Sequence, residues 1–274
     1  MSRNNKKKKD KIKKVRIDEL LVNLGLVPDI DLARRMIVAH EVIANDNLIK
    51  NPSDKVLSTS SIRFKNQKKY VSRGGDKLEG AILNLGLNPD TIFKDKIILD
   101  IGASTGGFSD YSLQHGAKLV IALDVGTNQL SWKLRKDPRI IAIDQTNIKD
   151  FTKKMVIDKI VSKINNDMNK DKNKEDKSPD FSIYPQFIHS LNIDWVLADI
   201  SFNSLSKLAS YIVKGSESDD YLLLIKPQFE LPKSDIPEGG VVKDETLRQK
   251  ALSMVIESFK EQGFSQFKSI VLIS

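Results

Sequence analysis

The sequence predicts an α/β protein with a doubly wound, mostly parallel sheet, preceded by a small α/β domain. Three observations predict it: short apolar runs alternate with helical stretches, a glycine-rich turn follows one of these runs, and an acidic residue ends several of them. The expected strands lie near residues 96–101, 118–124, 139–143, 194–199, 221–226 and 268–273. Helical stretches such as 205–213 and 245–262 separate the later strands, and such alternation is typical of parallel strands joined by right-handed crossovers.

The glycine-rich turn follows the strand expected at 96–101 and precedes a helix. Glycine lets the backbone approach a ligand closely, and the free amides at the start of the helix point toward that ligand. Nucleotide-like cofactors are held in this way. The candidate cofactor-binding residues of this segment are Asp100, Gly102, Ser104, Thr105, Gly106, Gly107 and Phe108.

Acidic residues also end three further apolar runs, at Asp124, Asp144 and Asp199. Strand C-termini of an open α/β sheet line one crevice, so we expect these side chains and Asp100 at one ligand. Asp124 suits the two hydroxyls of a ribose. Glycines and one acid also fit a dinucleotide, but four acids in series favour S-adenosylmethionine, with Asp144 as a further cofactor-binding residue. The simpler alternative is that each acid caps the helix that follows it.

Composition sets the outer limits of function. The length of 274 residues allows one large and one small domain, and 40% apolar residues suffice for a packed core. No apolar run suits a membrane span and no signal peptide follows the basic start, so we expect a cytoplasmic protein with no membrane partner. The absence of cysteine excludes disulfides and thiolate metal sites, and we assign no metal site. Residues 1–14 carry +7 of the net charge of +8, which indicates a disordered arm or a salt-sensitive phosphate contact.

Residues 15–65 have a pattern of their own. Apolar residues at helical spacing predict one helix, and a second helix over 31–40 presents the adjacent bases Arg34 and Arg35 before a short strand. Two small helices with strands around them resemble the RNA-binding module first known from protein four of the small ribosomal subunit. This resemblance makes both arginines candidate RNA contacts. The chain departs from the module at His40 and Asp46, where glycines are usual.

A polar, basic link is expected at 66–76, in which Lys68, Lys69 and Arg73 are further candidate RNA contacts. The glycine pair before Lys77 is typical of a helix start with a charged first turn. In the functional interpretation, Lys77 lies on that first turn and faces the cofactor crevice.

Lys226 directly follows a strand expected to be buried. A charge at such a position is usually paired, because burying it alone is costly. Asp199 ends a neighbouring strand, so we expect the two side chains to form an ion pair, with Lys77 opposite. A lysine in this arrangement can orient a hydroxyl nucleophile and take its proton during an in-line methyl transfer.

A series of motifs occurs in order at residues 70–78, 99–108, 124–126, 132–135, 199–202, 225–230 and 239–244. In this order they resemble the hemolysin-A (TlyA) family, whose members join an S-four-type RNA-binding domain to an FtsJ-like, Rossmann-like methyltransferase domain. The resemblance implies S-adenosylmethionine-dependent methylation of a ribose 2′-hydroxyl, with ribosomal RNA or a ribosomal subunit as partner. It also implies an active site of Lys, Asp, Lys and Glu, whose first three members match Lys77, Asp199 and Lys226.

The fourth member lies in the family on a final strand, and this sequence ends at Ser274 before that strand. Three interpretations stay open: a truncated reading frame, a divergent enzyme that works with three residues, or a protein that only binds RNA, as a ribosome-assembly factor would. We expect cofactor binding with reduced turnover. The membrane-active hemolysin that the family's name suggests is not favoured, because no span, signal or long amphipathic helix occurs. Amine methylation is not favoured either, because residues 199–202 lack an Asn/Asp-Pro-Pro-aromatic motif.

The predicted organisation is a disordered basic tail at 1–14, the RNA-binding domain at 15–65, the link at 66–76 and the methyltransferase domain at 77–274. A polar segment without apolar period predicts a disordered insert at about 163–190 in the last of these.

Overall fold

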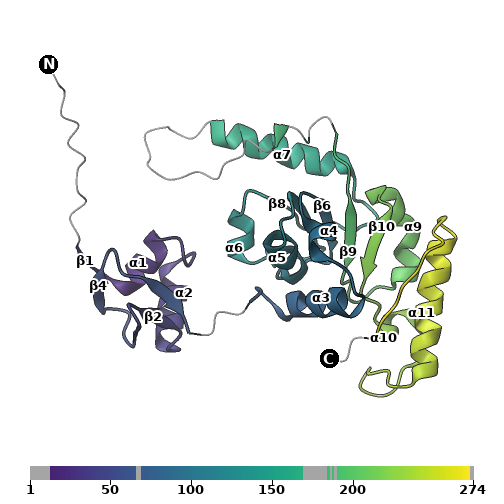
Figure 1. The fold of residues 1–274 in the computed structure, drawn as a ribbon, viewed down its shortest axis with the longest axis horizontal. Coiled ribbons are helices and arrows are strands. Elements are labelled where there is room, and N and C mark those ends of the chain that lie inside the picture. Colours follow the sequence, from purple (N-terminus) through teal and green to yellow (C-terminus); the bar gives the residue numbers. More distant parts are fainter. Residues whose placement is uncertain (1–12, 66–68, 169–183, 186, 188–189, 272–274) are drawn as a thin grey trace. The chain divides into compact units, whose positions relative to one another are not determined.

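The computed structural model describes residues 13–65, 69–168, 184–185, 187 and 190–271 (Figure 1). The chain divides into two compact units, with the boundary between Lys68 and Lys69. Within the described ranges, no helix is long and apolar enough to cross a bilayer.

The first unit consists of two short helices and two small antiparallel sheets. Its elements are β1 (Lys14–Arg16), α1 (Ile17–Asn23), α2 (Ile30–Val38), β2 (Val42–Ala44), β3 (Asn47–Leu48), β4 (Lys55–Leu57) and β5 (Ile62–Phe64). β1 pairs with β4, and β2 lies between β3 and β5. Apolar side chains that include Ile17, Leu21, Ala33 and Ile37 form the core of this unit.

Local hydrogen bonds fix the position of α2. Asp29 caps the helix, because its carboxylate accepts a hydrogen bond from the Leu32 amide at 2.7 Å. The fully buried Asp18 of α1 accepts hydrogen bonds from Arg16 at 2.7 Å and from Arg34 at 3.2 Å. The bonds from Arg16, with a smaller effect of Arg34, hold the pKa of Asp18 at about 2. Arg34 therefore ties the two helices together.

His40 and Asp46 both have left-handed backbones, with φ of 57° and 65°. Glycine adopts this conformation without the steric cost that a Cβ brings. The departure from the expected glycines at these two positions therefore carries a steric cost.

The second unit is built on a five-stranded sheet in the order β10-β9-β6-β7-β8. Its strands are β6 (Ile97–Ile101), β7 (Leu119–Leu123), β8 (Ile140–Ile143), β9 (Trp195–Ala198) and β10 (Asp220–Leu223). Every neighbouring pair is parallel, which confirms the predicted α/β sheet.

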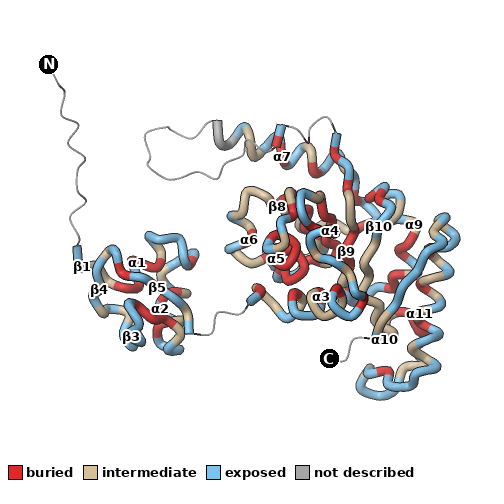
Figure 2. Tube along the Cα trace, viewed as in Figure 1, coloured by how far each residue is buried: buried red, intermediate tan, exposed pale blue. Residues whose placement is uncertain are grey.

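Helices cover both faces of this sheet. On one face lie α3 (Arg73–Asn84), α4 (Pro89–Phe93), α5 (Gly107–Gln114) and α6 (Trp132–Lys136). On the other lie α7 (Lys153–Met168), α9 (Leu205–Ser216) and α11 (Glu245–Lys260), while the short α10 (Pro227–Glu230) and the 3₁₀ turn η1 (Lys233–Asp235) follow β10. Side chains alternate along β6, so Ile98 packs under the first group and Leu99 under the second. Figure 2 shows the resulting buried strands between exposed helix surfaces.

The strand predicted at 268–273 is wrong for its described part. Residues 264–271 pair with no strand, most of them are exposed, and residues 272–273 lie outside the described ranges. An apolar alternation forms a strand only where a neighbour supplies the ladder of hydrogen bonds. β10 forms the edge of the sheet within the described residues, but residues 264–271 do not pair with it and so form no ladder.

The expected disordered insert at 163–190 is too wide at both ends. α7 continues to Met168, and Tyr184 and Phe187 are buried in the core under the sheet. These two aromatic side chains lie in a short apolar stretch, 181–191, that the expected insert wrongly included with the polar run before it. Residues 169–183 lie outside the described part of the chain.

Candidate active site

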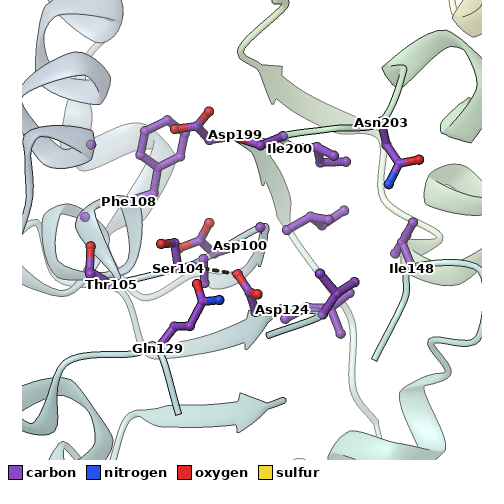
Figure 3. A pocket seen from close by; sticks show the side chains of 18 of the residues that line it. Asp100, Ser104, Thr105, Phe108, Asp124, Gln129, Ile148, Asp199, Ile200 and Asn203 are labelled. Atoms are coloured by element: carbon purple, nitrogen blue, oxygen red, sulfur yellow. Dashed lines mark hydrogen bonds between the residues drawn. The ribbon is translucent and has the colours of Figure 1, made fainter. Parts of the chain in front are cut away.

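A cavity of about 430 Å³ lies at the carboxyl ends of β6, β7 and β9. Figure 3 shows the side chains of Asp100, Asp124 and Asp199 around it. Polar and glycine residues of its wall include Ser72, Gly74, Lys77, Gly102, Ser104, Thr105, Gly107, Gln129, Thr146, Asn147, Ser201, Asn203 and Lys226. The apolar part of the wall includes Phe108, Leu123, Val125, Ile148, Ile200, Phe202 and Leu208. No glutamate is present among the described residues that line it.

The turn after β6 requires glycine at Gly102. Its φ is 78°, and a Cβ there would lie 2.9 Å from the carbonyl oxygen of Asp199. The turn after β6 therefore contacts the backbone of the loop that follows β9. Gly106 also has a left-handed φ, of 96°, but a Cβ on it would meet Leu130 and Leu134 rather than the cavity. Gly106 is thus a packing position and does not line the cavity.

Helices α3 and α5 approach each other through glycine. A Cβ on Gly107 would lie 2.4 Å from Ser72 Oγ and 2.6 Å from the Gly75 nitrogen. The glycine pair of α3 therefore allows the start of α5 to pack closely against it. α3 begins at Arg73, inside the expected link, because Ser72 caps it with a hydrogen bond from the Gly74 amide. Lys77 consequently lies on the second turn, not the first, and it lines the cavity.

Asp124 is held by amides of the turn after the neighbouring strand β6 and of its own loop after β7. Its two carboxylate oxygens accept hydrogen bonds at 2.7 Å, one from the Ser104 amide, drawn as a dashed line in Figure 3, and one from the Gly126 amide. Each carboxylate oxygen keeps a further lone pair, so the side chain still offers acceptors to hydroxyl groups in the cavity. Asp144 behaves differently: it forms an ion pair with Arg135 at 2.7 Å and is not part of the cavity wall.

Asp100 is the most buried acid of the cavity wall, with 1% of its surface exposed. Its Oδ2 accepts a hydrogen bond from Ser109 Oγ at 2.6 Å, and its buried Oδ1 has no partner among the described residues. Burial, together with the nearby charges of Asp199 and Asp124, raises the pKa of Asp100 to about 7. A cationic group in the cavity would supply the missing partner.

Lys226 and Asp199 form the ion pair that the sequence predicts, with Nζ 2.6 Å from Oδ1. Lys226 also donates a hydrogen bond to Ser201 Oγ at 2.8 Å. A lysine ammonium has three donors, so the hydrogen bond to Ser201 leaves donors for the paired Asp199 carboxylate and for a group entering the cavity. Lys77 lies in the same wall, so the three expected side chains gather at one cavity.

The sequence assigned no role to Ser201 or Phe202, although both stand in the motif that follows β9. Phe202 is 89% exposed, has a left-handed φ of 64°, and its ring lies 5.7 Å from that of Phe229. An aromatic ring held open to solvent at the cavity rim by a costly backbone conformation is a common mark of a functional position. Gln129 was missed as well, because its place over Gly126 depends on the loop after β7.

Residues 70–271 match the model of the FtsJ-like methyltransferase family. The chain belongs to this family. Like its relatives, this FtsJ-like methyltransferase depends on S-adenosylmethionine.

Several characterised relatives align with most of this FtsJ-like methyltransferase. Hemolysin A of Brachyspira hyodysenteriae is 36% identical and covers 92% of this chain and 90% of its own length. The 16S/23S rRNA (cytidine-2′-O)-methyltransferase TlyA of Mycobacterium tuberculosis is 30% identical, with 92% of this chain and 81% of that protein covered. A solved structure from Streptococcus thermophilus, provisionally named a hemolysin, is 32% identical over 92% of this chain and 80% of that chain, with a TM-score of 0.53.

The residues of the FtsJ-like methyltransferase cavity fit S-adenosylmethionine. The unpartnered Oδ1 of Asp100 suits a cation, and the cofactor carries a sulfonium and an ammonium group. Asp124 has acceptors for the ribose hydroxyls. The positive φ of Gly102 brings the backbone of the turn to the cavity wall, where a side chain would collide with Asp199.

The candidate RNA contacts of this FtsJ-like methyltransferase differ in exposure and in whether an acid already pairs with them. Arg35 and Arg73 are exposed, whereas Arg34 is bonded to Asp18 and Lys69 forms an ion pair with Glu79. Lys68 lies outside the described residues.

Proposed function

We propose that this protein transfers a methyl group from S-adenosylmethionine to ribose 2′-hydroxyls of ribosomal RNA. The observation that carries the proposal is the Lys226–Asp199 pair at the same cavity as the glycine turn after β6. The similarity to relatives named as rRNA 2′-O-methyltransferases supports the choice of substrate.

The chain's own residues explain how a hydroxyl group would be prepared. Asp199 pairs with the Lys226 ammonium and Ser201 accepts one of its hydrogen bonds, and a further donor of the ammonium would hold the oxygen of the 2′-hydroxyl. The bound cofactor supplies an electrophilic methyl group. Holding the oxygen in line with that group removes most of the orientational cost of the reaction, and the ammonium stabilises negative charge that develops on the oxygen. As the new bond to the methyl group forms and the methyl–sulfur bond breaks, the hydroxyl proton would pass to Lys77 in the same cavity wall or to water.

An exposed aromatic side chain at the rim suits a nucleotide substrate. Phe202 is 89% exposed and lines the same cavity as Lys226, and unstacked bases of RNA commonly stack on such rings. We propose that a base next to the reacting ribose stacks on Phe202. The first unit, with the exposed Arg35, would add binding to RNA phosphates.

The test is transfer of labelled methyl groups from S-adenosylmethionine to ribosomal subunits that lack the modification. The full chain is compared with Lys77→Ala and with Lys154→Ala, whose exposed lysine lies on α7 and pairs with Asp158 of the same helix. We expect label from the wild type and from Lys154→Ala, loss with Lys77→Ala, and 2′-O-methylnucleosides in the digested RNA. Label on a base would refute the ribose assignment, and no label with tight RNA binding would indicate a binding factor.

A further inference from the structure

Glu230 is a buried acid that does not belong to the cavity. Only 5% of its surface is exposed, and it stands at the end of α10, one helical turn after Lys226. Its Oε1 accepts a hydrogen bond from the Leu205 amide at 2.6 Å. Its Oε2 accepts hydrogen bonds from Ser204 Oγ at 2.7 Å, and from the amide and hydroxyl of Ser206 at 3.2 Å and 2.8 Å. One carboxylate thus satisfies the first donors of helix α9.

This bonding pattern has a clear physical cause. The first amides of a helix have no partner within the helix, and the helix dipole favours a negative charge at that end. α9 spans twelve residues, and its capping residue Ser204 bonds directly to Glu230. The carboxylate is therefore held rigidly at the start of α9.

The two segments that Glu230 joins carry the two members of the central ion pair. The loop that ends at Ser204 begins with Asp199 and also carries Ser201. The turn that ends at Glu230 begins with Lys226, whose carbonyl accepts a hydrogen bond from the Phe229 amide at 2.9 Å, while Pro227 fixes the backbone at the first position of the turn. The distance of 2.6 Å between Lys226 and Asp199 thus depends on how these segments are held together.

We propose that Glu230 is a positioning residue that holds Lys226 against Asp199 by tying α10 to the start of α9. The expected effect of Glu230 on the rate rests on the proposed methyl transfer, whereas its effect on the position of Lys226 does not. Glu230 acts through Lys226 and does not touch the substrate.

Glu230→Gln is the sharpest test because it keeps the size of the side chain. An amide has one acceptor oxygen, so its NH₂ group must face the donors of Leu205 or those of Ser204 and Ser206. Asp194→Asn is the matched control. Asp194 also ties the chain together, accepting hydrogen bonds from the Ile97 amide at 2.8 Å and from Lys96 at 3.1 Å, but at the opposite end of β9.

Two measurements on the full chain decide the matter. The first is the reactivity of Lys226 toward limiting acetic anhydride without RNA, quantified by mass spectrometry against Lys207 and Lys243. We expect Lys226 labelling to rise several-fold in Glu230→Gln and to stay at the wild-type level in Asp194→Asn. The second is the rate constant of methyl transfer in a single turnover. We expect this rate constant to fall about 10- to 100-fold in Glu230→Gln, as a misplacement of about 1 Å would cause. The S-adenosylmethionine concentration that gives half the maximal rate should not change.

Unchanged labelling of Lys226 in Glu230→Gln would overturn the inference, as would a fall in rate shared equally by Asp194→Asn. If the wild type transfers no methyl group to RNA, the proposed function fails, but the labelling result still supports or refutes the role of Glu230. A Glu230→Asp variant that restores wild-type labelling would support positioning by the carboxylate.

Discussion

The buried Asp100 predicts an unusual dependence of stability on pH, which Asp100→Asn should remove. Burial raises the pKa of this carboxyl to about 7 in the folded protein, above the value of about 3.9 expected in the unfolded chain. The folded state therefore binds more protons than the unfolded state between these values. The contribution of Asp100 to the free energy of unfolding consequently falls as the pH rises from about 4 to about 7. A shift of this size corresponds to about 4 kcal/mol across that window.

Urea denaturation of wild type and variant at pH steps from about 4 to 8 measures this contribution directly. Both tryptophans, Trp132 and Trp195, lie in the second unit, so their fluorescence reports on the unit that contains Asp100. At low pH we expect the two proteins to be similar, because an amide oxygen can also accept the hydrogen bond of Ser109. Above pH 7 the variant should be the more stable by up to about 4 kcal/mol.

A second variant tests the direction of the shift. The hydroxyl of Ser109 lowers the pKa of Asp100 by bonding its carboxylate, so Ser109→Ala should extend the falling part of the stability curve to higher pH. If the stability curves of wild type and Asp100→Asn run parallel over the whole range, the carboxyl is not held protonated by burial and the reasoning is refuted.

Three further predictions concern the site. Lys226→Met should lower kcat for methyl transfer by about 10²- to 10⁴-fold without changing the Kd for S-adenosylmethionine measured by calorimetry, and equal losses in both would place the lysine in cofactor binding instead. Phe202→Ala should raise KM for the RNA by about 10-fold, the effect of one lost stacking contact, while Phe202→Tyr keeps it near the wild-type value in the same steady-state assay. Gly107→Ala should lower the free energy of unfolding by about 1–3 kcal/mol in urea titrations, because its Cβ would collide with Ser72 and Gly75; a wild-type midpoint would show that α3 and α5 move apart freely.

The sequence was sufficient for the parts of the fold that depend on local pattern. The strands from β6 to β10 are apolar runs, and their predicted positions are confirmed to within a few residues at each end. The segment 268–273 has a similar apolar pattern, but a strand also needs a partner, and pattern alone does not report one. The start of α3 was misplaced because the Ser72 cap and the contact of its glycines with Gly107 join segments far apart in the chain.

Within the site, spacing placed acids and lysines at strand ends but could not assign their partners. Asp144 follows a strand as Asp124 does, yet Arg135 binds it and it stays out of the cavity wall. Glu230 follows Lys226 by four residues, yet its carboxylate is bonded to the start of α9 and does not line the cavity. The partner of each charged side chain depends on which residues lie next to it in the folded chain. Those residues are often far away in sequence, so spacing does not identify them.

The order of the strands separates the two tasks of the site. The turns after β6 and β7 carry the groups that fit the methyl donor, whereas the segments after β9 and β10 carry Asp199, Phe202 and Lys226. At the site itself, the backbones meet across this border where the Asp199 amide donates a hydrogen bond to the Ile101 carbonyl at 3.1 Å and where Gly102 lies against Asp199. Evolution can therefore exchange the acceptor side of the crevice for a new substrate while the donor side stays intact, and grafting the segments after β9 and β10 between relatives should transfer acceptor preference without rebuilding the donor pocket.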